Sequence, residues 1–436
     1  MELLSDHLQH PAAGHKPAGT TPWQGIAGMS DSNFNINDGV PGGETDVSDT
    51  FTETTQTSWL ARIWESIKGV LFGLLLLVIG IVLLFWNEGR AVQTYRSLAE
   101  GKGLVVSADP TRVDPANEGK LVHVAGEAKA PGRVSDSEFG VTSDGLALER
   151  KVEMFQWKEE SHSESRKKLG GGEETVTTYS YSRVWSGKKI ESSSFKQPGG
   201  HSNPEMRYGS RDFFARDAKL GAYRLDDQTL SQLSATQPIQ VDAALANAVR
   251  GRIGGQAQVS DGALYLGANP GQPRIGDLRV TFAAAPEGPI SVIGRQANGG
   301  FERYQTHAGD KLLMAESGLK TSDQMFKEAA DENRILTWFL RAFGSILVFA
   351  AFGLMLKPLE VVADVVPIIG NIVGFGSGIA AALLTAIVAP VTIAIAWFWY
   401  RPLVSLLVIA AGLGLAYMIK RYGAQKAGAA PQAARA

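Results

Sequence analysis

The run Gly69–Trp86, GVLFGLLLLVIGIVLLFW, contains 18 residues and no charged side chain. As an α-helix it would be about 27 Å long, close to the roughly 30 Å hydrocarbon core of a bilayer. Buried helices of soluble proteins seldom avoid charge over this length, so the run predicts a membrane span. Because Asn-Glu-Gly-Arg follows it instead of a small-residue cleavage site, we expect a retained anchor and not a signal peptide.

Three further apolar runs lie near the other end of the chain. They cover 335–356, which contains one charge, Arg341, and 372–400 and 403–419, which contain none. Together with the first run they predict a multi-pass α-helical membrane protein of four spans. The rest divides into a disordered acidic tail (1–57), a large extramembrane domain (87–334) and a short C-terminal tail (421–436). The prediction that 1–57 are disordered rests on their abundant Gly, Ser, Thr, Pro and Asp and their few apolar residues.

The 87–334 segment favours a β-rich α+β domain. Short apolar or alternating runs predict strands at 120–126, 152–158, 175–185, 263–266, 277–282 and 290–295. The charged, glycine-containing stretch 159–174 reads as the solvated end of a long hairpin. Helical patterns are expected at 203–217 and 226–249, and a helix capped by Thr321 or Ser322 is expected to continue into the second span.

Composition excludes several classes of function. The 436 residues carry a net charge of −2, from 42 basic and 44 acidic side chains, so no strong positive field is available for a nucleic-acid partner. The absence of cysteine removes disulfides, thiolate nucleophiles, Cys-zinc sites and iron–sulfur clusters. No HExxH, P-loop or GxSxG motif occurs, and the seven histidines show no metal-ligand spacing. We expect no catalytic residue, metal site or cofactor.

Basic residues near the span ends predict the orientation. One set of ends carries Arg62, Lys68, Lys357, Lys420, Arg421 and Lys426. With four crossings these residues share one side, which the positive-inside rule makes cytoplasmic together with both termini. The 87–334 domain would then lie outside the cytoplasm. The opposite span ends also carry basic residues, so the bias is modest.

Tryptophans mark the expected membrane interfaces. Ser58 can cap a helix whose apolar face includes Trp59 and Trp64, and this segment is either an interfacial helix (58–68) or an extension of the first span. Trp86 and Trp338 lie at the ends of the first and second spans. Indole rings prefer the headgroup level, so all four are candidate anchors.

Charges at the membrane ends form a second group of candidates: Glu88, Arg90, Arg341 and Arg401. Arg341 lies about 9 Å along its helix from Ile335. It can either reach the headgroups with its long side chain or pair with Glu88 at the same end of the first span.

Gly370, Gly374 and Gly378 recur every four residues. On a helix they form a smooth stripe that another helix can approach closely, which makes them candidates for helix packing. The alternative is a non-helical break in a glycine-rich stretch, and Pro367 favours a turn or re-entrant start over 361–371. Pro390 predicts a kink in the long third run.

Ten short segments, in order, resemble the transmembrane protein 43 family, also called LUMA. They are 87–90 (NEGR), 97–107 (SLAEGKGLVVS), 117–126 (NEGKLVHVAG), 152–157 (VEMFQW), 179–181 with Trp185, 203–204, 276–282 (GDLRVTF), 292–296 (VIGRQ), 338–344 (WFLRAFG) and 400–403 (YRPL). The resemblance covers about 60–420. It implies four spans, a large lumenal or extracytoplasmic domain after the first, and cytoplasmic termini.

The resemblance also carries functional expectations. Animal members lie in the endoplasmic reticulum and inner nuclear membrane, self-associate and bind other membrane proteins. Bacterial members are thought to organise membrane domains in the inner membrane, and the acidic tail and Ala/Gly-rich C-terminus here favour a bacterial source. The family has no established catalytic residues.

Three functions remain open. The leading hypothesis is a membrane scaffold that self-associates and organises membrane protein complexes or lipid domains, with lipids, a second copy and other membrane proteins as partners. The alternative is a membrane-bound hydrolase acting on lipid or envelope substrates through the 87–334 domain, for which His123, His201 or acidic groups would have to converge. A transporter is third, because only Arg341 lies within a span.

Overall fold

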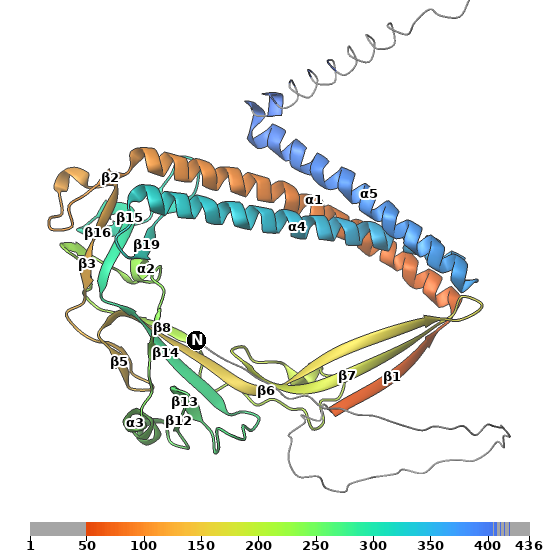
Figure 1. Ribbon diagram of the computed structural model, residues 1–436, viewed down its shortest axis with the longest axis horizontal. Helices are drawn as coiled ribbons and strands as arrows, with labels where there is room; N and C mark the ends of the chain where they lie inside the picture. The colour runs from red at the N-terminus through yellow and green to blue at the C-terminus, as the bar shows by residue number, and fades with distance from the viewer. Residues whose placement is uncertain (1–48, 404, 408–409, 411–413, 415–417, 419–436) are drawn as a thin grey trace, which may run out of the picture. The chain divides into compact units, whose positions relative to one another are not determined.

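Three long helices and a β-rich region make up the computed structural model, which describes residues 49–403, 405–407, 410, 414 and 418 (Figure 1). The long helices are α1 (Trp59–Leu104), α4 (Ser322–Ala363) and α5 (Pro367–Tyr400), and each is long and apolar enough to cross a membrane. The prediction of membrane helices with a large β-rich domain is confirmed at this level. Most of the predicted fourth span, 403–419, lies outside the described residues, so the total of four spans stays a prediction.

Local caps explain where these helices begin. The Ser58 hydroxyl accepts a hydrogen bond from the Ala61 N–H, as the sequence predicts, and α1 then runs unbroken through the first apolar run. Thr321 and Gln324 form a capping box at the start of α4. α4 also continues into its apolar run as expected. Residues 59–68 and the first apolar run therefore belong to one continuous helix.

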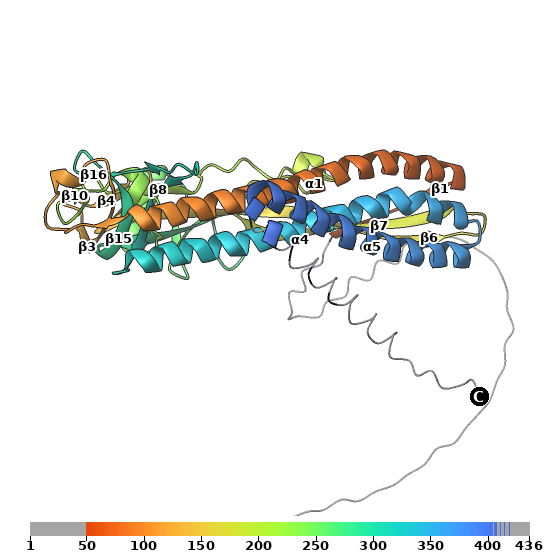
Figure 2. The same ribbon diagram turned by 90° about the horizontal axis from the view of Figure 1, so that it is seen from above.

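The helices extend beyond their apolar runs. α1 has 46 residues, which is about 69 Å of helix, and α4 has 42. Views from two directions show α1 and α4 side by side along their length (Figures 1 and 2). A short link, 364–366, separates α4 from α5. Of the two alternatives that the sequence left open over 361–371, a turn or a re-entrant start, the structure has a turn between two helices just before Pro367.

An eight-stranded sheet contains the longest strands. Its order is β1-β7-β6-β14-β13-β12, with β11 also paired to β14 and β8 to β6. The bounds are β1 (Asp49–Thr57), β6 (Gly145–Lys167), β7 (Glu173–Ser186), β8 (Arg211–Phe214), β11 (Gln237–Ile239), β12 (Gln258–Ser260), β13 (Ala263–Leu266) and β14 (Leu278–Pro286). β6 pairs with β14 through Met154 and with β7 from Met154 to Lys167, so one strand belongs first to the centre of the sheet and then to a long hairpin.

A seven-stranded sheet lies next to the C-terminal end of α1. Its order is β19-β15-β16-β10-β9-β3-β2, with β15 also paired to β3. The bounds are β2 (Val106–Ser107), β3 (Leu121–Lys129), β9 (Lys219–Leu220), β10 (Tyr223–Arg224), β15 (Gly288–Ala297), β16 (Gly300–Glu302) and β19 (Met314–Ser317). Two small pairs, β4 (Val134–Asp136) with β5 (Val141–Ser143) and β17 (Tyr304–Gln305) with β18 (Lys311–Leu312), complete the strands described.

Side chains from both large sheets form the main core, which includes Val124, Leu148, Phe282 and Val292. A second cluster joins the helices to the seven-stranded sheet. Leu98 of α1 and Phe326 of α4 pack there with Leu121 and Ile293. We refer below to the β-rich region around these two clusters as the body.

Three sequence predictions are wrong in detail. The expected helix 203–217 contains strand β8, and the expected helix 226–249 is divided into α2 (Asp227–Leu230) and α3 (Ala243–Ile253) with β11 between them. Asp226 does cap α2, but the following residues satisfy their backbone groups in a sheet. The disordered tail predicted over 1–57 is wrong for 49–57, because Asp49–Thr57 form β1, and 1–48 lie outside the described residues. This strand pairs along its whole length with β7, a long-range pairing that a polar, Thr-rich segment does not reveal by hydropathy.

Candidate functional site

Glu88 occupies the point where the three long helices meet. Its side chain is 2 % exposed. Arg341 of α4 donates through Nε to Oε1 at 2.6 Å and through a terminal nitrogen to Oε2 at 2.8 Å. Trp397 of α5 donates its indole N–H to Oε2 at 2.8 Å. One carboxylate therefore joins α1, α4 and α5 by charge-assisted hydrogen bonds.

Aromatic rings cover the other partner of this ion pair. The Arg341 guanidinium carbon lies 4.7 Å from the centre of the Trp338 ring and 5.9 Å from that of Trp397. Ring faces attract the cation, and they shield the pair from water. Of the two sequence hypotheses for Arg341, the structure contains the pairing with Glu88.

A polar layer lies next to this pair between α1 and α4. Arg90 donates to the Asn333 side-chain oxygen at 2.9 Å and to the Thr337 hydroxyl at 3.0 Å. The Asn87 amide donates to the Thr337 carbonyl at 3.1 Å, and Asn333 donates to the Ala91 carbonyl at 3.1 Å. Sequence reasoning found Arg90 but missed its partners. The signal was available, because Asn333 and Thr337 are four residues apart and share a helix face.

Arg401, the last predicted membrane-end charge, lies at the end of α5. Its guanidinium carbon is 5.5 Å from the centre of the Tyr95 ring of α1. Nearby, Arg96 donates to the Tyr400 carbonyl at 2.6 Å, and the Tyr400 ring packs over Gly89. The YRP segment thus attaches the end of α5 to α1.

A second charged cluster lies at the N-terminal end of α1. Arg62, which is 7 % exposed, contacts Asp364 at 2.6 Å and Glu173 at 2.7 Å and donates to the Gly171 carbonyl at 2.6 Å. Lys167 contacts the fully buried Asp364 at 2.8 Å and also bonds to Glu360. Burial acts to lower the pKa of Lys167, but its hydrogen bonds to Asp364 and Glu360 outweigh burial and raise that pKa above its usual value. Sequence analysis treated Arg62 only as a flanking charge.

The predicted tryptophan anchors have different surroundings. Trp64, Trp86 and Trp338 are 61, 54 and 63 % exposed, as interface residues require. Trp59 is half-buried, donates to the Val361 carbonyl at 2.9 Å and packs on Gly171. Trp59 is therefore part of the contact between the β6–β7 hairpin and the helix ends.

The three glycines of the predicted stripe have two different kinds of surroundings. A Cβ atom at Gly370 would collide with the Asp364 carboxylate, and one at Gly374 would lie 2.9 Å from the Glu360 side chain. These two glycines let α5 approach the end of α4 in the same chain. A Cβ at Gly378 would meet nothing within 4 Å.

Other glycines, missed by sequence reasoning, bring α1 and α4 together. A Cβ at Gly73 would lie 2.9 Å from the Ala351 carbonyl, one at Gly80 would lie 2.9 Å from Val348, and one at Gly344 would lie 2.7 Å from Leu84. Gly73 and Gly80 are seven residues apart, the spacing of a helix–helix seam. This seven-residue spacing is the feature of the sequence that could have indicated the packing of α1 on α4.

The histidines that a hydrolase would need do not converge. His123 lies on β3 of the seven-stranded sheet, with Nε2 at 2.9 Å from the Lys320 carbonyl, and burial lowers its pKa. His201 stacks on Tyr181 of β7 at 3.9 Å between ring centres, and its Nε2 lies 3.2 Å from Asp49. Because both imidazole rings have partners within the protein, both histidines fit structural roles. Within the described part of the chain, no group of three or more His, Asp or Glu residues is arranged to hold a metal ion.

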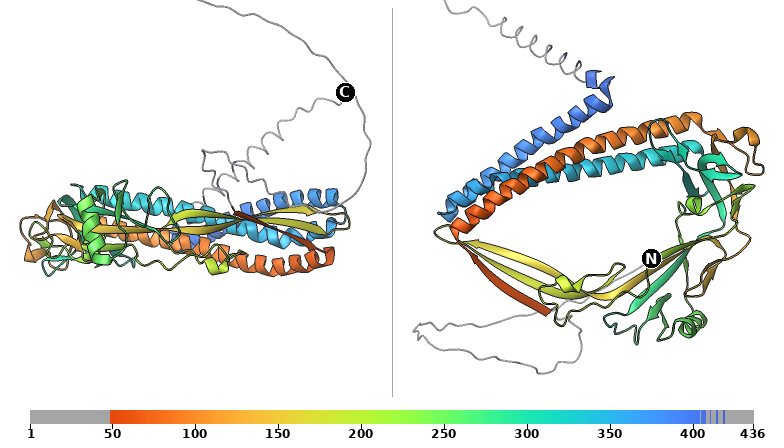
Figure 3. Two further views of the ribbon diagram at one scale, coloured as in Figure 1. Left: turned by 90° about the horizontal axis from the view of Figure 1, so that it is seen from below. Right: turned by 180° about the vertical axis from the view of Figure 1, so that it is seen from behind.

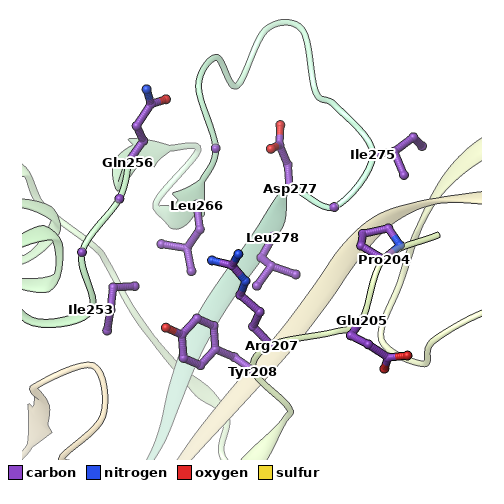
Figure 4. Close-up of a pocket in the computed structure, with 14 residues that line it drawn as sticks. Pro204, Glu205, Arg207, Tyr208, Ile253, Gln256, Leu266, Ile275, Asp277 and Leu278 are labelled. Atoms are coloured by element: carbon purple, nitrogen blue, oxygen red, sulfur yellow. The ribbon is translucent and has the colours of Figure 1, made fainter. Parts of the chain in front are cut away.

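One pocket of about 420 Å³ lies in the body between the loop before β8, the end of α3 and the β13–β14 connection (Figure 4). Asp277 is on its wall, but the carboxylate accepts the Tyr265 hydroxyl at 2.5 Å and the Arg274 N–H at 2.8 Å. Burial and the hydrogen bond to Asp277 raise the pKa of the Tyr265 hydroxyl above its usual value. The pocket lining contains neither histidine nor serine.

The fold and these clusters define a class: a membrane protein whose apolar helices are joined by buried ion pairs to a large β-rich domain. Comparison with known proteins gives the family. A family model described as Transmembrane protein 43 matches residues 154–402. The chain belongs to the transmembrane protein 43 family, which confirms the resemblance seen in the sequence.

Relatives match over most of their length. Human transmembrane protein 43 is 32 % identical over 379 residues, which cover 83 % of this chain and 91 % of the human one. The rat protein is 31 % identical, with coverage of 81 % and 89 %. The Drosophila melanogaster homolog is 27 % identical, with coverage of 81 % and 95 %. No solved structure matches this chain.

Proposed function

We propose that this protein is a membrane scaffold that self-associates through its helices and organises membrane protein complexes or lipid domains. The observation that carries the proposal is a stripe of small residues on the outer face of α5. Gly378, Ala382 and Ala386 recur every four residues and are all exposed in the single chain. Gly378 has open space where a Cβ would stand.

Small residues at this spacing favour association between membrane helices. Lipid tails are as apolar as the helix surface, so helices gain most from close backbone approach and van der Waals packing. Gly370 and Gly374 already serve this purpose within the chain, against α4. The following turns of α5 offer the same surface to another helix, and we propose that a second copy takes it.

Lipids, a second copy and other membrane proteins are the partners of this scaffold, and nucleic acid is not. We propose no enzymatic activity and no cofactor. In support, Glu88 and Arg341 satisfy each other, and Asp364 is held by two cations. His123 lies on β3 of the seven-stranded sheet, whereas His201 lies in a loop and stacks on Tyr181 of the eight-stranded sheet. The side of the membrane that each terminus occupies stays a prediction from the flanking charges.

Crosslinking of the full chain in detergent and in native membranes tests self-association. We expect wild type to give dimers or larger species, and Gly378→Leu or Ala382→Leu to shift them towards monomer. Ile379→Leu, on an exposed neighbouring position of α5, is the matched control and should crosslink as wild type does. A wild-type protein that is strictly monomeric, or stripe variants that crosslink as well as the control, would show the proposal to be wrong.

A further inference from the structure

A pocket of about 780 Å³ lies where α1 and α4 join the body, at the end of the molecule where Figure 3 shows both helices meeting the strands. α1 forms one wall from Arg90 to Leu98, and α4 forms another from Ala329 to Leu336. Residues 309–314 of the body, together with Arg303, form the third wall. A volume of this size lies in the range of small-molecule sites.

The pocket lies at the level of the lipid headgroups when α1 and α4 cross a bilayer. The uncharged run of α1 ends at Trp86, and Arg90 is about 6 Å of helix beyond it. On α4, Leu336 lines the pocket and is the second residue of the apolar run that begins at Ile335. The headgroup regions add roughly 5–7 Å on each side of the hydrocarbon core. The exposed indoles of Trp86 and Trp338 mark the same level.

Two cations of the body wall have no carboxylate partner in the described part of the chain: Arg303, next to β17, and Lys311, the first residue of β18. The Nε atom of Arg303 lies 2.9 Å from the side-chain amide of Gln228, which is neutral. Arg303 and Lys311 both line this pocket and also a neighbouring one of about 630 Å³, so their side chains border the same space. Cations without a counterion in a pocket attract an anionic group.

The other charged residues of the pocket do not cancel these two cations. Arg90 donates to neutral side chains of α4, and its Nε atom is buried without a hydrogen-bond partner among the described residues. Asp310 accepts from the Gln93 amide at 2.6 Å, and Glu332 is exposed. The lining thus contains three cations and two carboxylates, and its net charge is positive.

The side of the pocket nearest the membrane is apolar. Leu336 lies there, and Phe339 and Phe343 follow it after three and seven residues, on the same face of α4. These three side chains are 44, 65 and 46 % exposed. They lead from the pocket along the apolar run of α4. A ligand that fits the whole surface has an anionic head and an apolar chain.

We propose that this pocket binds a phospholipid, with its phosphate at Arg303 and Lys311 and an acyl chain along Leu336, Phe339 and Phe343. Phosphate oxygens accept charge-assisted hydrogen bonds from guanidinium and ammonium groups. The acyl chain enters the leaflet beside α4, so the lipid fastens the body to the membrane surface. The proposal does not rest on self-association, because α5 contributes no residue to the pocket.

A lipid titration of the full chain tests this site. The delipidated protein in detergent is titrated with dioleoylphosphatidylglycerol, and bound lipids are counted by native mass spectrometry. Dioleoylglycerol, which lacks the phosphate, and glycerophosphoglycerol, which lacks the chains, are the comparison ligands. The variant Arg303→Gln/Lys311→Gln removes both cations. Its matched control, Arg216→Gln/Lys219→Gln, also removes one arginine and one lysine, which are exposed on the body and do not line this pocket.

We expect wild type and the control variant to bind one phospholipid per chain at a saturable site. Affinity should fall at least about tenfold in Arg303→Gln/Lys311→Gln, because the phosphate loses charge-assisted hydrogen bonds. Both comparison ligands should bind more weakly than the phospholipid. Equal phospholipid binding by the two double variants would overturn the proposal. Glycerophosphoglycerol that binds as tightly as the phospholipid would also overturn it, because the ligand would then be a soluble phosphate. Crosslinking of wild type is read separately, so self-association and lipid binding can fail independently.

Discussion

Glu88 shows how a single buried carboxylate can hold three membrane helices. Both oxygens accept from Arg341, and one also accepts from Trp397, so removing either charge leaves an unmatched ion between apolar helices. Breaking a buried pair from one side costs about 3–5 kcal/mol, whereas removing both partners costs less.

We therefore expect Glu88→Gln to lower the free energy of unfolding by about 3 kcal/mol, near the lower end of that range because glutamine still accepts a hydrogen bond. The double variant Glu88→Gln/Arg341→Leu should lose less than the sum of the single variants. Denaturant unfolding in detergent measures all three.

The control is the exposed pair Glu65–Lys68 on the same helix. Glu65→Gln should change stability by no more than about 1 kcal/mol. If Glu88→Gln has wild-type stability while Arg341→Leu fails to assemble, the ion pair does not have the role described.

His123 makes stability depend on pH. Its ring is buried and its pKa lies below the usual value because burial disfavours the cation. The unfolded chain then binds a proton more readily than the folded one, so stability is complete above about pH 6.5 and falls as the pH decreases below it. We expect the melting temperature of wild type to drop between pH 7.5 and 5.5 by more than that of His123→Gln. Equal drops in the two proteins would show that other groups determine the acid response.

At the scale of elements, the sequence predicted what hydropathy encodes. The apolar runs beginning at Gly69 and Ile335 are too long and too free of charge for ordinary soluble helices, and helices cover them. β1 was missed because its stability comes from a ladder with β7, more than 100 residues away. In the 203–217 segment the apparent helical spacing was overridden by pairing of β8 with β6.

Packing of α1 on α4 depends on glycine. Because a Cβ at Gly80 would lie 2.9 Å from the Val348 side chain, Gly80→Ile should force the helices apart and cost about 1–3 kcal/mol. Gly69→Ile is the matched control, since a Cβ there meets nothing within 4 Å. Thermal unfolding of the two variants in the same detergent measures the difference. Equal melting temperatures would mean that α1 and α4 do not pack as described.

At the scale of the whole described molecule, the arrangement rests on contacts that no local pattern reveals. Arg62 and Asp364 are 302 residues apart, and each alone reads as an ordinary flanking charge. The candidate pairing of Glu88 with Arg341 was accessible because both residues were placed at the same end of apolar runs. Nothing comparable marked Lys167 or Glu173 as neighbours of a helix end.

The attachment of the β6–β7 hairpin to the helix ends leads to the last prediction. Arg62 bonds both to the tip of the β6–β7 hairpin, through Glu173 and Gly171, and to the end of α4, through Asp364. Arg62→Met should release the hairpin tip, since Asp364 would keep only Lys167. Hydrogen exchange over 165–175 and along β1 should become faster, and trypsin should cut sooner after Lys167 or Lys168. Lys357→Met removes a cation that contacts Glu360 at the same end but is 46 % exposed, and it should leave the tip protected. If the hairpin tip is equally protected in the two variants, the hairpin is held by its own strand pairing, and the Arg62 cluster is not what keeps it against the helices.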